Sequence, residues 1–64
     1  MKIIPFGDVI EERFEISREY GLIEMVSGFC RLTEKCKRNY EGVSFVLYLK
    51  GEVEKPERIS EKGE

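Results

Sequence analysis

The sequence predicts a small α+β domain: a mixed or antiparallel sheet of about three strands packed on one long amphipathic helix, in the order β-β-α-β. Three observations lead to this fold class. A short apolar run occupies residues 2–6, apolar residues recur with helical spacing over residues 22–38, and a nearly continuous apolar run fills residues 43–53. A chain of 64 residues forms one domain at most.

The first predicted strand covers residues 2–6. Pro5 has no backbone N–H to donate, which places this strand at an edge of the sheet. Gly7 and Asp8 indicate a turn directly after it. The sequence therefore begins with a short edge strand.

Residues 9–16 are compatible with two structures. As a helix, Asp8 would be the N-cap and Glu11 would complete a capping box. As a strand, Ile10, Phe14 and Ile16 would share one face. The apolar residues form no continuous helical stripe, so a second strand is favoured and the helix remains the alternative.

Residues 22–38 match a helix better than a strand. Ser17 is a suitable N-cap, and cationic residues near the far end suit the helix dipole. Gly42 suits the exit from the helix. At about 100° per residue, the apolar positions fall within an arc of about 120°; they are Leu22, Met25, Val26, Phe29, Leu32, Thr33 and Cys36.

The last predicted strand covers residues 43–53 and is apolar on both faces. Phe45 and Leu47 fall on one face, whereas Val46 and Tyr48 fall on the other. Residues 55–64 are dense in charge, so the domain is predicted to span residues 1–54 and to end in a disordered tail.

This arrangement leaves one face of the sheet without a cover, because one helix covers only one face. Val46 and Tyr48 would then need a second partner surface, and a second copy of the chain is the simplest source. The sequence therefore predicts a homo-oligomer, most simply a dimer, with Val46 and Tyr48 at the interface. An unidentified protein partner is the other candidate.

The two cysteines lie six residues apart. On a helix, Cys30 and Cys36 would be about 9 Å apart along the axis, too far for a disulfide and wrongly spaced to share a metal. They are predicted to be buried packing residues. Two alternatives stay open: an intermolecular bridge through Cys30, and a reactive thiol activated by Arg31 and Lys35.

A basic stripe follows from the same helical spacing. Arg31, Lys35 and Arg38 recur at i, i+4 and i+7, a pattern suited to contact with nucleic acid or another anion. The alternative is a solvated helix face that pairs these cations with Glu24 and Glu34. The alternative is favoured, because no RNA-binding signature accompanies the stripe.

Composition narrows the function classes. The chain has no histidine, which removes the commonest general base and zinc ligand, and it carries no phosphate-binding or catalytic motif. A net charge of −2 gives no general attraction to nucleic acid or anionic membranes. We expect a cytoplasmic, non-enzymatic interaction protein without cofactor or metal; a nucleic-acid-associated module is the alternative function.

Overall fold

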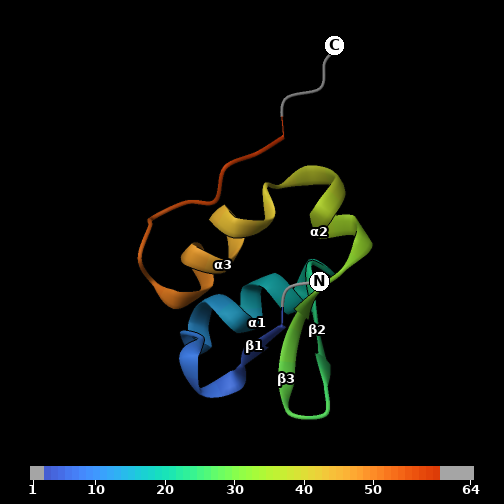
Figure 1. The fold of residues 1–64 in the computed structure, drawn as a ribbon, viewed down its shortest axis with the longest axis vertical. Helices are drawn as coiled ribbons and strands as arrows, with labels where there is room; N and C mark the ends of the chain where they lie inside the picture. Colours follow the sequence, from blue (N-terminus) through green and yellow to red (C-terminus); the bar gives the residue numbers. More distant parts are fainter. Residues whose placement is uncertain (1–2, 60–64) are drawn as a thin grey trace.

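The computed structural model describes residues 3–59 and confirms an α+β domain with a three-stranded sheet (Figure 1). The predicted order β-β-α-β is wrong, however, because three helices alternate differently with the strands. The elements in chain order are β1 (Ile3–Pro5), the 3-10 helix η1 (Phe6–Asp8), α1 (Glu11–Glu19), β2 (Ile23–Val26), β3 (Phe29–Leu32), α2 (Glu34–Asn39) and α3 (Gly42–Lys50).

The sheet is antiparallel with strand order β1-β3-β2, so β3 is the central strand. Cys30 on β3 stands opposite Ile4 on one side and Met25 on the other. Strand β1 is an edge strand that ends at Pro5, as the sequence predicts. Helix α1 contacts both strand β2 and helix α3. Helices α1 and α3 lie on the same side of the sheet, where they share its core (Figure 1).

The predicted helix over residues 22–38 is instead the β2–β3 hairpin followed by the short helix α2. The hairpin turns at Ser27 and Gly28, whose φ angles of 50° and 82° are both positive. Two consecutive residues with positive φ are typical of the tight turn that joins antiparallel strands. The turn interrupts the segment midway, so a single helix cannot form.

Residues 9–16 belong mostly to α1, so the favoured strand is wrong and the helical alternative is correct in type. The N-cap is Ile10, which makes no side-chain cap, rather than the predicted Asp8. The helix buries Phe14 and Ser17 against the rest of the molecule. Two buried positions in nine residues explain the weak helical stripe in the sequence.

The predicted strand over residues 43–53 is helix α3. The Glu41 side chain accepts a hydrogen bond from the backbone N–H of Ser44 at 2.7 Å and caps the first turn. Gly51 ends the helix in the left-handed conformation with φ of 85°. Phe45 and Leu49, one helical turn apart, are its buried residues.

The core lies between one face of the sheet and the helices. It comprises Ile4, Phe14, Leu22, Ile23, Cys30, Leu32, Cys36, Phe45 and Leu49. Arg13 fastens α1 to the end of α3, because its Nη1 donates to the carbonyl oxygens of Tyr48 and Val53 at 2.7 and 2.8 Å. A cation at the C-terminal end of α3 also complements the helix dipole.

The first part of the predicted disordered tail is hydrogen-bonded to the domain. The backbone N–H of Glu41 donates to the carbonyl of Glu57 at 2.9 Å, and the N–H of Glu57 donates to Ser44 Oγ at 2.7 Å. Arg58 also pairs with Tyr40 as an isolated antiparallel bridge. Residues 57–59 are therefore hydrogen-bonded to the rest of the chain, and the remainder of the predicted tail, residues 60–64, lies outside the described residues.

Candidate interaction surface

One face of the sheet is turned away from the helices. Side chains alternate along a strand, and the register places Pro5, Phe29 and Val26 side by side across all three strands on the face opposite the core. Val26 and Phe29 are 40% and 43% exposed. We refer to this surface, formed by Pro5, Glu24, Val26, Phe29 and Arg31, as the open face.

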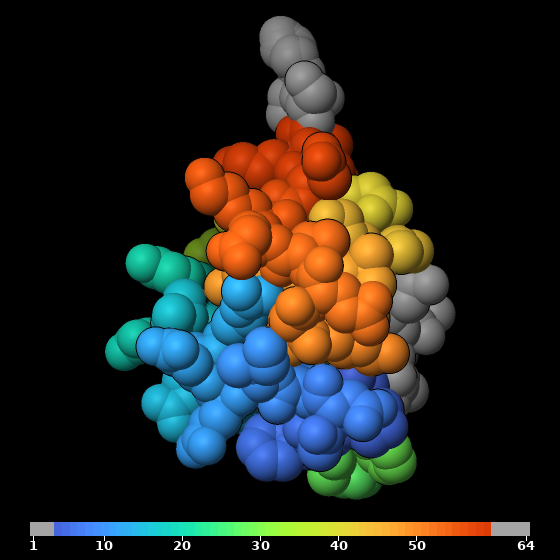
Figure 2. Space-filling model, turned by 90° about the vertical axis from the view of Figure 1, so that its left-hand side faces the viewer, coloured from blue at the N-terminus to red at the C-terminus, as the bar shows by residue number. Residues whose placement is uncertain are grey.

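The hairpin turn brings the open face to one end of the molecule. In Figure 2 the green hairpin turn lies directly beside the dark-blue segment that begins at residue 3. Phe6 on η1 directly follows Pro5, and Met25 on β2 directly precedes Val26; each is 42% exposed. Exposed apolar residues therefore gather around the hairpin end, and large exposed apolar patches often mark binding surfaces.

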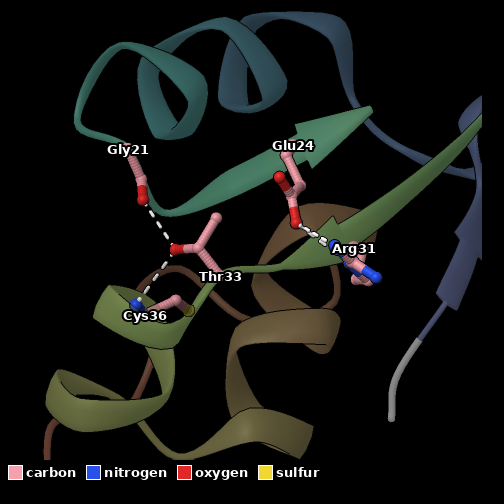
Figure 3. A network of polar contacts seen from close by, with 5 residues as sticks. All are labelled: Gly21, Glu24, Arg31, Thr33 and Cys36. Carbon is pink, nitrogen blue, oxygen red and sulfur yellow. Dashed lines mark hydrogen bonds and ion pairs between the residues drawn. The ribbon is translucent and has the colours of Figure 1, made fainter. Parts of the chain in front are cut away.

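An ion pair occupies the other half of the open face. Arg31 and Glu24 are directly opposed on β3 and β2, and Arg31 Nε and Nη2 donate to Glu24 Oε2 at 2.9 and 2.5 Å (Figure 3). Both side chains are partly exposed. The open face thus combines an apolar row with one positive and one negative group side by side.

The predicted basic stripe is not continuous. Arg31 lies on strand β3, whereas Lys35 and Arg38 lie on helix α2. Lys35 Nζ donates to the carbonyl oxygen of Tyr20 at 2.9 Å, and Arg31 pairs with Glu24. The predicted pairing of Glu24 with Arg31 is confirmed, although it is formed across two strands. Nucleic-acid contact by Lys35 and Arg38 stays a prediction.

The predicted interface residues Val46 and Tyr48 both lie on α3, half-buried, and pack against the chain's own core. The ring of Tyr48 stands 5.5 Å from that of Phe45, and the guanidinium of Arg13 lies 4.6 Å from the Tyr48 ring centre. The side-chain surfaces of Val46 and Tyr48 that a partner would contact are therefore packed against residues of the same chain. The uncovered sheet face that the sequence predicts exists, but other residues form it.

Both cysteines are free and fully buried, which confirms the prediction of packing residues. Burial raises the pKa of both thiols, that of Cys36 to about 11 even though Lys37 opposes the shift. Cys30 Sγ lies 3.8 Å from Met25 Sδ inside the molecule. Buried, protonated thiols are poor nucleophiles, so neither the bridge through Cys30 nor the reactive thiol is favoured.

Residues 3–59 contain no cluster of three or more side chains that could ligate a metal ion. Within the same range, no helix has the length and apolar character needed to cross a membrane.

One local sequence signal indicates the open face, and helical periodicity does not detect it. Ser27-Gly28 stands between the strand-forming residues Val26 and Phe29, and a Ser-Gly pair flanked by such residues indicates a hairpin. A hairpin assignment would have placed Val26 and Phe29 directly opposite each other.

Comparisons with known proteins give no relative. No protein-family model, curated protein or solved structure matches the chain. The surface chemistry therefore carries the inference about function.

Proposed function

We propose that this chain is a small non-enzymatic interaction protein that forms a homodimer through the open face. The observation that carries the proposal is the exposed apolar row of Pro5, Phe29 and Val26, which crosses all three strands on the side without helices. Burying such a row against a second sheet removes it from water, which favours association by about 25 cal/mol per Å² of apolar surface.

A second copy suits this face because its charges are self-complementary. In a dimer with a two-fold axis, each copy presents the same patch to the other. One orientation brings Arg31 of each copy toward Glu24 of its partner, so the two ion pairs become a ring of four alternating charges. A partner with a uniformly charged surface would lack this match.

The size of the patch sets the expected strength. The open face is formed by three strands of three or four residues each, far smaller than the roughly 800 Å² per partner of a standard stable interface. We therefore expect a weak dimer with a dissociation constant on the order of tens of micromolar. Such a dimer would respond to the local concentration of the protein.

Sedimentation velocity over concentrations from about 10 µM to about 1 mM tests the proposal. The wild-type protein should shift from monomer to dimer across this range. The variant Val26→Lys should stay monomeric, because the two-fold axis places added positive charge opposite added positive charge. Val43→Lys is the matched control, since Val43 is 49% exposed on α3 and should dimerise as the wild type does.

A charge swap distinguishes specific pairing from general stickiness. Glu24→Arg alone should weaken the dimer, whereas the double variant Glu24→Arg with Arg31→Glu should restore it, because the charges again alternate. A wild-type chain that sediments as a monomer at about 1 mM would refute the homodimer. Equal dimerisation of Val26→Lys and Val43→Lys would place the interface elsewhere.

A further inference from the structure

A groove on the other side of the molecule has the features of a binding site. It lies between the end of α1, helix α2 and residues 56–58, and it has two connected parts that share Tyr20, Leu22 and Tyr40. The inner part has a volume of about 130 Å³ and the outer part about 440 Å³. We refer to both parts together as the tyrosine groove.

Aromatic side chains form the wall of the inner part. The ring of Phe45 stands 5.2 Å from that of Tyr40 and 5.5 Å from that of Tyr48, both in tilted contact. Phe45 is fully buried behind the two tyrosines, which limits their movement. An apolar or aromatic group that enters would therefore meet a preformed surface and require little reordering.

A buried hydroxyl without a partner also lines the inner part. Ser17 is 1% exposed and borders the cavity, yet its hydroxyl makes no hydrogen bond to any residue in the range 3–59. Its backbone carbonyl is used separately and accepts from the N–H of Leu22 at 2.9 Å. Buried polar groups are nearly always hydrogen-bonded, so this hydroxyl is available to a polar atom of a ligand.

Two cations stand at the outer part. Lys35 Nζ uses one of its three N–H donors on the carbonyl of Tyr20, at 2.9 Å. Arg58 Nη1 donates to Tyr40 Oη at 3.3 Å, and its guanidinium lies 5.2 Å from the centre of that ring. Among the described residues, no carboxylate forms an ion pair with either cation. Both therefore have donors left for an anion.

The Asn39 side chain completes the outer part. Its Nδ2 donates to the carbonyl of Lys35 at 2.8 Å, which leaves its amide oxygen as an acceptor beside the cations. The outer part is thus positively charged and holds one hydrogen-bond acceptor. The inner part is apolar with one hydroxyl, so the polarity changes in a defined direction along the groove.

We propose that the tyrosine groove binds a small anion built on a single aromatic ring. Cavities of about 150 Å³ accept benzene, so the inner part fits one six-membered ring but not a fused pair. A phosphate or carboxylate on the ring would receive hydrogen bonds from Lys35 and Arg58, and a polar substituent on the opposite side would reach Ser17. The groove and the open face use different residues, so the two proposals fail independently.

The test uses 4-hydroxyphenyl phosphate as the probe, titrated into the ¹⁵N-labelled protein and followed by amide chemical shifts. Saturable shifts should cluster around Tyr20, Lys35 and Arg58. Hydroquinone, which lacks the phosphate, and 2-naphthyl phosphate, which has two fused rings, should each bind at least about tenfold more weakly. An affinity for 2-naphthyl phosphate equal to that for the probe would refute the single-ring limit.

Variants test the three contacts separately. Lys35→Gln with Arg58→Gln should weaken the probe about tenfold or more, whereas Lys37→Gln, on the same helix but outside the groove, should leave its affinity unchanged. Ser17→Ala should remove the preference for 4-hydroxyphenyl phosphate over phenyl phosphate and leave phenyl phosphate binding as before. No saturable shift with either phosphate, or equal losses in Lys37→Gln and the double variant, would overturn the proposal.

Discussion

Phenylalanine is exposed at the hairpin end of the molecule but buried at the helical end, where the helices pack together. Phe29 on β3 is 43% exposed on the open face, whereas Phe45 on α3 is 1% exposed between Tyr40 and Tyr48. A small domain has few residues with which to cover both sides of a sheet. The helical end therefore holds the core, and the hairpin end leaves apolar surface available to a partner.

The largest expected contrast between the two ends comes from truncating each phenylalanine. Phe45→Ala should destabilise the domain by about 3–5 kcal/mol, because it leaves a cavity in the core. That loss is comparable to the whole stability of many small domains, so we expect the variant to be largely unfolded. Circular dichroism during urea titration measures both effects.

Phe29→Ala is the matched comparison at the hairpin end. It should cost the monomer about 1 kcal/mol or less, because the side chain is already half in water. It should instead reduce dimer formation at high concentration. Equal destabilisation of the two variants would show that the hairpin end contributes as much to the core as α3 does.

Alkaline pH should destabilise the domain through the buried thiols. Burial raises the pKa of Cys36 to about 11 from the ordinary value of 9.0, which the unfolded chain keeps. The Cys36 thiol therefore stays protonated to a higher pH in the native state than in the unfolded state. Below about pH 9 the Cys36 thiol does not make the free energy of unfolding depend on pH. Between pH 9 and 11 it should lower the free energy of unfolding by about 1.4 kcal/mol per pH unit.

Urea titrations of the wild type and of Cys36→Ala at pH 8, 9 and 10 measure this effect. The variant should be less stable at pH 8, because it leaves a small cavity, but its stability should fall less steeply above pH 9. All other side chains are the same in the two proteins, so their contributions cancel in the comparison. Parallel curves for the two proteins would mean that Cys36 ionises as easily in the native state as in the unfolded chain.

The smallest contrast concerns two glycines with nearly equal backbone angles. Gly51 at the end of α3 has φ of 85° and Gly28 in the hairpin turn has φ of 82°. A Cβ at position 51 would fall well inside contact distance of Ile10 Cδ1, whereas nothing lies within 4 Å of one at position 28. Gly28→Ala should cost about 1 kcal/mol of strain, and Gly51→Ala should cost about 1 kcal/mol more.

Thermal unfolding followed by circular dichroism compares the two glycine variants. Gly51→Ala should have the lower melting temperature. In the Ile10→Ala background, the methyl group added by Gly51→Ala no longer meets the Ile10 side chain. Gly51→Ala should therefore lower the melting temperature less in that background than it does in the wild type. Equal melting temperatures for Gly28→Ala and Gly51→Ala would mean that Ile10 moves aside without cost.

The sequence predicted the fold class and the edge strand, but it assigned most of the other elements wrongly. Residues 22–38 satisfy a helical pattern because buried residues of three separate segments have spacings that add up to helical intervals: Leu22 directly before β2, Cys30 and Leu32 on β3, and Cys36 on α2. Periodicity counts cannot separate a continuous helix from such a sum. The deciding interaction is the local turn at Ser27 and Gly28, which periodicity does not register.

The strand predicted over residues 43–53, which is α3 in the structure, was wrong for a different reason. Its sequence is rich in Val, Phe and Tyr, which favour strands when considered residue by residue. Glu41 and Gly51 cap it as a helix, and burial of Phe45 and Leu49 one turn apart then outweighs the local preference. The tyrosine groove was equally out of reach, because α1, α2 and residues 56–58 meet only in the folded chain.

The distribution of the tyrosines gives the protein a built-in optical reporter. The chain has no tryptophan, and all three tyrosines line the tyrosine groove. Nearly all of its absorbance and fluorescence near 280 nm therefore originates from one site. A change in tyrosine emission measures what happens in that groove alone, and the hairpin end, which carries no tyrosine, remains optically silent.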